Sequence, residues 1–145
     1  MNSFWNKNLN LFVDRFPELC KNLSITRDTK EPLTSCYEVL PSKSGSLTAK
    51  ENNIFIHSAY NPEKEAESLI KNCKQENQIG AIFLSCGLGY APVEYSKAFP
   101  TDTIFIIEPD IEYFFAFLKY IDLEELFSHK KLVIALKIDF QVILN

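Results

Sequence analysis

Three residues of a glycine turn and one carboxylate are the best candidates for chemistry in this chain of 145 residues. Gly87, Gly89 and Tyr90 follow a short apolar run, and Glu108 lies 19 positions after Gly89. In nucleotide-binding α/β folds a ligand lies on such a turn, and an acidic residue roughly 20 positions later binds the ribose hydroxyls. The spacing therefore predicts a small nucleotide or S-adenosylmethionine site, as in methyltransferases.

The glycine pattern also has a purely structural interpretation. A dinucleotide fingerprint requires Gly or Ala where Pro92 stands, whereas the looser G-x-G-x-G/A turn of methyltransferases is met by Gly87, Gly89 and Ala91. Glycines at a tight turn between a strand and a helix often serve packing alone, because they lack a Cβ. The pattern by itself favours this second interpretation, since short motifs match by chance.

His57, Ser58 and Tyr60 form the main polar cluster of the first half of the chain. His57 is therefore a further candidate for ligand binding, although a single His at a strand end is usually a hydrogen-bonded structural residue. The nucleophile-elbow motif G-x-S-x-G is absent, and nothing in the sequence supports a Ser-His-acid triad. We therefore predict no catalytic residue.

The four cysteines, Cys20, Cys36, Cys73 and Cys86, are scattered and form no C-x-x-C pair. This spacing indicates neither a zinc site nor a redox pair, so we predict no metal and no cofactor. Cys73, on an apolar helix face, and Cys86, after a buried strand, are expected to be buried thiols in a reducing compartment. Cys86 adjoins the glycine turn and would be reactive only if its pKa were low.

Composition and charge exclude some classes of partner. The formal net charge is −4 and the pI about 5.2, which argues against nucleic acid and against an anionic membrane surface. There is no signal-peptide pattern and no apolar run of the ~20 residues that a membrane helix needs. We therefore expect a cytoplasmic protein with no membrane partner.

The first half of the chain predicts an amphipathic helix followed by a small β-meander. The helix runs over residues 1–23 and is interrupted before Pro17. A polar linker extends to residue 34, so residues 1–34 form a helix and linker, and residues 35–145 an α/β domain. Strands at 37–40, 46–49 and 54–56 fill residues 35–58. The aromatic residues at helical spacing are Trp5, Phe12 and Phe16, with Leu9 among them.

The second half predicts a helix over 61–78 and a Rossmann-like βαβαβ unit over 79–136. Asn61 is the expected N-cap, and Ala66, Leu69, Ile70 and Cys73 form its apolar stripe. The expected buried strands cover 81–84, 103–107 and 132–136, and a Phe-rich helix covers 111–120. The run 81–84 is predicted to be a central strand with both faces covered. The fold class is thus α/β: a small N-terminal β-meander with helices, then a half-Rossmann unit.

Four segments, in this order, resemble the N-terminal domain of the motility-associated factor (Maf) glycosyltransferases. Residues 57–66 resemble the family's "HS-x-Y-x-P-x-x-EA" helix entry, and residues 87–90 its glycine turn. Residues 106–110 resemble its acidic strand end, and residues 121–123 the "x-D-L" after the next helix. Many relatives carry a polar residue, often His, at the place of Ala91.

The resemblance implies a bacterial, cytoplasmic, motility-related protein. The family transfers nonulosonic sugars of the pseudaminic or legionaminic acid type from nucleotide-activated donors to Ser or Thr of flagellin. Its transferase domain lies downstream of the matched stretch. The chain ends in Val142-Ile143-Leu144 without a polar tail. We therefore expect a piece of a longer protein that is not catalytic by itself.

Three hypotheses follow from these observations. The first is a scaffold or binding domain of a flagellin-modifying glycosyltransferase, with the downstream transferase domain and the flagellin acceptor as partners. The second is a small Rossmann-like domain that binds a nucleotide, a nucleotide-sugar or S-adenosylmethionine. The third is an interaction module whose contact surfaces are the Phe-rich helices around Phe12 and Phe114.

Overall fold

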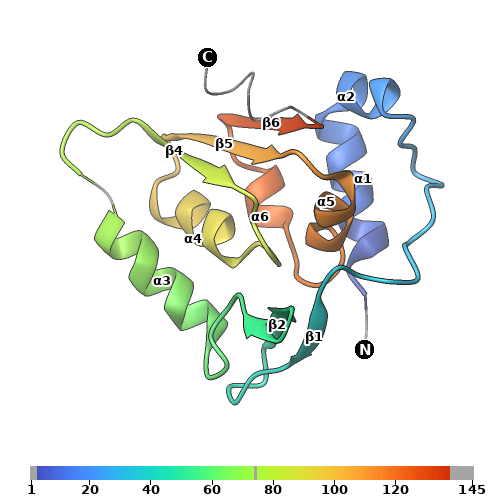
Figure 1. The fold of residues 1–145 in the computed structure, drawn as a ribbon. Coiled ribbons are helices and arrows are strands. Elements are labelled where there is room, and N and C mark those ends of the chain that lie inside the picture. The colour runs from blue at the N-terminus through green and yellow to red at the C-terminus, as the bar shows by residue number, and fades with distance from the viewer. Residues whose placement is uncertain (1–2, 74, 138–145) are drawn as a thin grey trace.

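The computed structural model describes residues 3–73 and 75–137, which form a β-meander and a parallel sheet joined by helices (Figure 1). The predicted apolar run Val142–Leu144 lies outside the described residues. The helices are α1 (Trp5–Arg15), α2 (Pro17–Asn22), α3 (Pro62–Cys73), α4 (Tyr90–Ala98), α5 (Ile111–Phe117) and α6 (Glu124–Phe127). The strands are β1 (Glu38–Pro41), β2 (Leu47–Glu51), β3 (Ile54–Phe55), β4 (Gly80–Leu84), β5 (Thr103–Glu108) and β6 (Leu132–Leu136).

The meander is antiparallel in the order β1-β2-β3, as the sequence predicts. Val39 pairs with Ala49, and Lys50 pairs with Phe55. The turn between β2 and β3 is formed by Asn52 and Asn53, whose φ angles of 51° and 63° are left-handed. Asn tolerates this conformation, so two adjacent Asn residues set the register of the pair.

The second sheet is parallel in the order β4-β5-β6, and this confirms the predicted fold class. Helix α4 connects β4 to β5, and α5 and α6 connect β5 to β6. Figure 1 shows these three helices together on one side of the sheet. The sheet is therefore half of a doubly wound arrangement, with the glycine turn at the carboxyl end of β4.

The predicted role of β4 as a central, fully buried strand is wrong. Among the described strands β4 lies at the edge of the sheet and β5 occupies the centre. The side chains of Ile82 and Leu84 are 65% and 57% exposed. Ala81 and Phe83, on the opposite face, pack against the core. An apolar run predicts burial on both faces, but the described helices cover only one of them.

The N-terminal helix packs in the main core and presents no aromatic surface for docking. The ring of Phe12 meets that of Phe114 at 4.9 Å between centroids, and both side chains are almost fully buried. Asn8 is also buried and donates hydrogen bonds to the carbonyls of Leu118 (2.9 Å) and Ile121 (2.7 Å). The hypothesis that the Phe-rich helices are contact surfaces is therefore wrong, because these surfaces are used within the fold.

Helix α3 starts as predicted but buries a narrower face. Asn61 Oδ1 accepts the N–H of Lys64 at 3.0 Å, which confirms the N-cap. Ala66 and Ile70 are buried, whereas Leu69 is 57% exposed. The expectation that Leu69 belongs to the buried stripe is therefore wrong. Its side chain borders the cavity described next.

Candidate functional site

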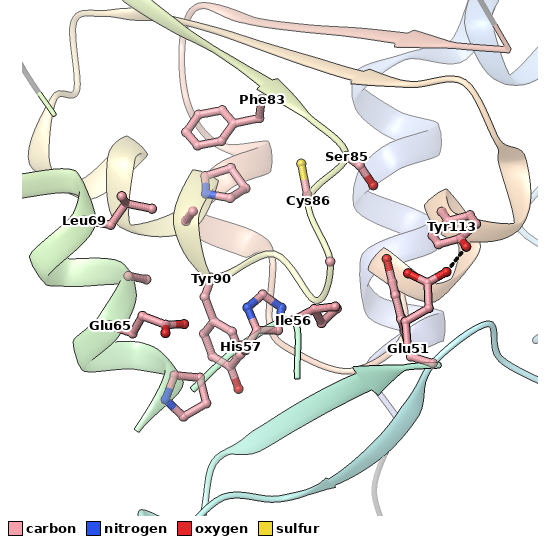
Figure 2. A pocket seen from close by; sticks show the side chains of 16 residues that line it. Glu51, Ile56, His57, Glu65, Leu69, Phe83, Ser85, Cys86, Tyr90 and Tyr113 are labelled. Atoms are coloured by element: carbon pink, nitrogen blue, oxygen red, sulfur yellow. Dashed lines mark hydrogen bonds between the residues drawn. The ribbon is translucent and has the colours of Figure 1, made fainter. Parts of the chain in front are cut away.

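A cavity of about 580 Å³ opens beside the glycine turn, at the carboxyl end of β4 (Figure 2). Its walls come from the meander, from α3, from the start of α4 and from α5. The volume lies within the range of small-molecule sites, and the place is where α/β sheets bind ligands. The residues that line the cavity include Tyr37, Glu51, His57, Glu65, Leu69, Phe83, Ser85, Cys86, Tyr90 and Tyr113.

His57 fills the glycine turn from the meander side. The backbone N–H of Leu88, inside the turn, donates to His57 Nε2 at 3.0 Å. The accepting nitrogen carries no proton, so the neutral ring holds its proton on Nδ1. The imidazole also meets the ring of Tyr90 edge-on, with centroids 5.3 Å apart. The turn N–H that would be offered to a phosphate is thus already used by a side chain of the same chain.

The surroundings of His57 favour its neutral form. Burial lowers the pKa of the imidazole below its ordinary value, and the nearby Glu65 carboxylate opposes this effect more weakly. A neutral imidazole is the state that accepts the Leu88 N–H. Electrostatics and hydrogen bonding therefore agree on one protonation state.

Each of the two glycines makes room for a particular neighbour. Gly87 has a φ of +57°, and a Cβ there would lie 2.6 Å from His57 Nε2. Gly89 has a φ of +107°, and a Cβ there would lie 2.9 Å from side-chain carbons of Phe117 and Leu123. The missing Cβ of Gly87 thus leaves space for the imidazole of His57, and that of Gly89 leaves space for the core side chains of Phe117 and Leu123. This is what the packing interpretation predicts.

Tyr90 connects the start of α4 to the meander. Its hydroxyl donates to the carbonyl of Leu47 at 2.6 Å. Burial raises the pKa of Tyr90 to about 12, and the Glu63 carboxylate adds to this effect. The aromatic ring lines the cavity, while the hydroxyl is engaged outside it.

Glu108 is buried at the end of β5 and lies outside the cavity lining. Its Oε1 accepts the N–H of Asp110 at 3.2 Å. Asp110 in turn caps α5, since its Oδ1 accepts the N–H of Glu112 at 3.0 Å. The carboxylate thus holds the turn between β5 and α5. The role of Glu108 toward ribose hydroxyls stays a prediction.

The described side chains of the lining include two carboxylates and no Lys or Arg. Glu51 accepts the hydroxyl of Tyr113 (Figure 2), and this hydrogen bond, followed by burial, raises the pKa of Tyr113 to about 12. Glu65 accepts the N–H of Ser58 at 2.9 Å. Carboxylates without a facing cation repel phosphates, so the walls suit a neutral or positively charged ligand.

The surroundings of Cys86 disfavour its thiolate. Burial raises its pKa well above the ordinary value, and the neighbouring Glu108 carboxylate raises it further. The nucleophilic form of cysteine is the thiolate, which this site disfavours at neutral pH. Within the described residues, no group of three or more His, Cys, Asp or Glu side chains could hold a metal ion.

The structure joins His57, Gly87 and Tyr90 at one cavity, whereas Gly89 and Glu108 are not among its lining residues. No local pattern predicted Tyr37, Glu51 and Tyr113 as wall residues, because they come from the meander and from α5. Ser85, which has a left-handed φ of 58°, was also missed. Such a conformation in a residue other than glycine leaves no pattern in the sequence.

Comparison with known proteins shows what the fold resembles. No known family profile matches the chain. An uncharacterized protein of Treponema pallidum (strain Nichols) is 32% identical over 135 residues, which are 90% of this chain and 46% of that protein. The chain therefore spans about half of that relative's length. Across the part of the chain that the structure describes, no helix has the length and apolar character to cross a membrane.

A solved structure has a similar fold across nearly the whole chain. The MAf glycosyltransferase from Magnetospirillum magneticum AMB-1 superposes with a TM-score of 0.62 at 15% identity. The match covers 97% of this chain and 28% of the glycosyltransferase. The fold described here therefore occurs as one part of a larger glycosyltransferase.

Proposed function

We propose that this chain is a non-catalytic N-terminal scaffold domain of a flagellin-modifying glycosyltransferase, a longer bacterial cytoplasmic protein that transfers a nonulosonic sugar. One observation carries the proposal: nearly the whole chain matches about a quarter of a MAf glycosyltransferase in fold. The motifs at residues 57–66, 87–90, 106–110 and 121–123 agree with it. The partners would be the transferase domain of the same protein and the flagellin acceptor.

Three features of the site support the proposed non-catalytic role. The turn N–H of Leu88 is taken by His57, the thiol of Cys86 is held protonated, and the cavity walls carry carboxylates without cations. A site that activates a nucleotide-sugar needs cations or free backbone N–H groups for the phosphate. The described cavity walls carry no Lys or Arg, and the turn N–H groups of Leu88 and Gly89 are bonded to His57 and to the Cys86 carbonyl.

Sugar transfer to flagellin tests the scaffold role. We expect this chain alone to transfer no sugar from a CMP-activated pseudaminic or legionaminic acid. The full-length protein should transfer it, a version lacking this domain should not, and adding this chain to the truncated protein should restore part of the activity. Unchanged transfer by the truncated protein would contradict the proposal.

The cavity favours a second candidate function, the binding of S-adenosylmethionine. This ligand carries a sulfonium and an ammonium, which suit the carboxylates of Glu51 and Glu65, and an adenine that suits the aromatic walls. Titration calorimetry with S-adenosylmethionine tests this function. The test variant is Leu69→Ala, which changes the rim of the cavity, and the control is Leu33→Ala, which changes an exposed leucine in the loop before β1. Loss of binding in Leu69→Ala alone would support this function, and no heat with the unaltered chain would exclude it.

A further inference from the structure

The parallel sheet has an outer face, turned away from α4, α5 and α6, that is apolar and accessible to solvent (Figure 1). Ile82 pairs with Phe105, and Phe105 pairs with Val133, so the three side chains form one row across the sheet. They are 65%, 40% and 42% exposed, and the neighbouring Leu84 is 57% exposed. The complete set of strand residues on this outer face is Gly80, Ile82, Leu84, Thr103, Phe105, Ile107, Val133 and Ala135.

The outer face differs from an ordinary solvated sheet surface. None of its eight strand residues is ionisable. Parallel sheets in α/β proteins have helices on both faces. The reason is that the side chains of their strands are apolar on both faces, without the alternation of apolar and polar residues seen in half-exposed strands. On the inner face Ile104 and Ile106 are buried under the helices. The outer face therefore has the composition of a buried surface. Among the described residues, however, no layer covers it.

Two lysines border the outer face. Side chains alternate along a strand, so Lys131, directly before β6, shares the parity of Val133 and Ala135. Lys137 directly follows β6 with a left-handed φ of 56°, so it is placed at the end of the strand and not by this alternation. Both lysines are exposed. A partner that presents an apolar stripe with acidic residues beside it would match the face in polarity and in charge.

We propose that the outer face binds an amphipathic α-helix, with an aliphatic stripe bordered by acidic residues, from the remainder of the longer protein. The T. pallidum relative and the solved glycosyltransferase both extend well beyond the matched domain, since the match covers 46% and 28% of their lengths. In a doubly wound sheet helices cover both faces, so a helix on the outer face would complete this arrangement. About 12 helical residues span the length of a five-residue strand, so one helix suffices.

A synthetic peptide tests this inference. The probe is a helical peptide of about 18 residues with leucines at i, i+3, i+4 and i+7 and glutamates beside them, a length at which isolated helices form. A matched peptide carries lysines in place of the glutamates. Fluorescence anisotropy with the full chain should show that the glutamate peptide binds at least tenfold more tightly than the lysine peptide.

Variants of the chain locate the contact. Phe105→Thr together with Val133→Thr keeps strand-forming residues and removes the apolar row, so binding of the glutamate peptide should fall at least tenfold. Lys131→Glu with Lys137→Glu should reverse the preference between the two peptides. Leu33→Thr removes a fully exposed leucine from the loop between α2 and β1, outside the parallel sheet, and should leave binding unchanged.

Three outcomes would overturn the inference. The first is that the glutamate peptide does not bind, and the second is that it binds the Thr double variant as tightly as the unaltered chain. The third is a dimer in sedimentation velocity that the Thr double variant abolishes, because the face would then be occupied by a second copy of this chain. Circular dichroism of each variant confirms that the fold is retained.

Discussion

The imidazole of His57 accepts the backbone N–H of Leu88 at 3.0 Å, and thereby joins two residues 31 positions apart. The contact links the end of the meander to the glycine turn of the parallel sheet. The same contact explains why glycine is needed at position 87, since a Cβ there would collide with the imidazole. It also occupies the Leu88 N–H, which is then not available as a hydrogen-bond donor to a phosphate. The first predictions therefore concern this pair.

Removing the imidazole should destabilise the chain because Leu88 keeps a buried N–H without a partner. We expect His57→Ala to lower the free energy of unfolding by about 1–3 kcal/mol. His57→Gln should lose less, since its amide oxygen can accept the same N–H. Urea denaturation measures both. Equal losses in the two variants would show that the hydrogen bond contributes nothing specific.

Gly87→Ala should cost more than Gly45→Ala, although both glycines have a positive φ. A Cβ at Gly45 meets nothing within 4 Å, whereas one at Gly87 would lie 2.6 Å from His57 Nε2. The backbone strain of about 1–2 kcal/mol applies to both, and the displacement of the imidazole is added at Gly87 only. Thermal unfolding measures the difference.

A double variant supplies the control for this comparison. In a His57→Ala background the two shortest contacts are removed and only Ile56 Cδ1, at 3.2 Å, stays close, so Gly87→Ala should cost less than it does in the unaltered chain. An undiminished cost in that background would contradict the packing role of Gly87.

The stability contribution of His57 should depend on pH. Burial lowers the folded-state pKa of His57, while an unfolded histidine titrates near ~6.5. As the pH falls below about 7, the unfolded chain therefore binds more protons, and the free energy of unfolding decreases. Above about pH 7 this contribution is fully present.

The expected signature is a difference between two proteins. The stability advantage of the unaltered chain over His57→Gln should shrink between about pH 7 and pH 5, because Gln does not titrate. Urea titrations at several pH values measure it. A constant advantage across this range would contradict the lowered pKa.

Cys86 should resist alkylation in the folded chain. Burial and the Glu108 carboxylate raise the pKa of its thiol, so little thiolate exists at pH 8. Iodoacetamide labelling followed by peptide mass spectrometry should modify Cys86 in the folded chain many times more slowly than in urea. Similar rates in both conditions would show an accessible thiolate.

Local patterns in the sequence predicted much of the fold. The paired Asn52 and Asn53 gave the turn of the meander, and Asn61 gave the start of α3. Apolar runs located the strands near 81–84, 103–107 and 132–136, because strand composition is a local property. The same runs could not show which strand lies at the edge, since strand order depends on contacts distant in sequence.

The candidate site was predicted only in part. Gly87 and Tyr90 were predicted because glycine turns leave a pattern, and His57 because it lies in a polar cluster at the end of a predicted strand. That His57 and Gly87 touch each other is a tertiary contact with no local signal. The wall residues Tyr37, Glu51 and Tyr113 come from distant elements, so sequence spacing could not bring them together.

Because His57 closes the glycine turn, we expect this domain alone to bind no activated sugar nucleotide. The most direct test is the thermal midpoint of the chain with and without a CMP-activated nonulosonic sugar. A ligand at about 100 times its dissociation constant adds ~2.7 kcal/mol and raises the midpoint by several degrees. The account predicts no change in the midpoint. A rise of several degrees that disappears in Glu108→Ala would contradict it and would make the turn a working nucleotide site.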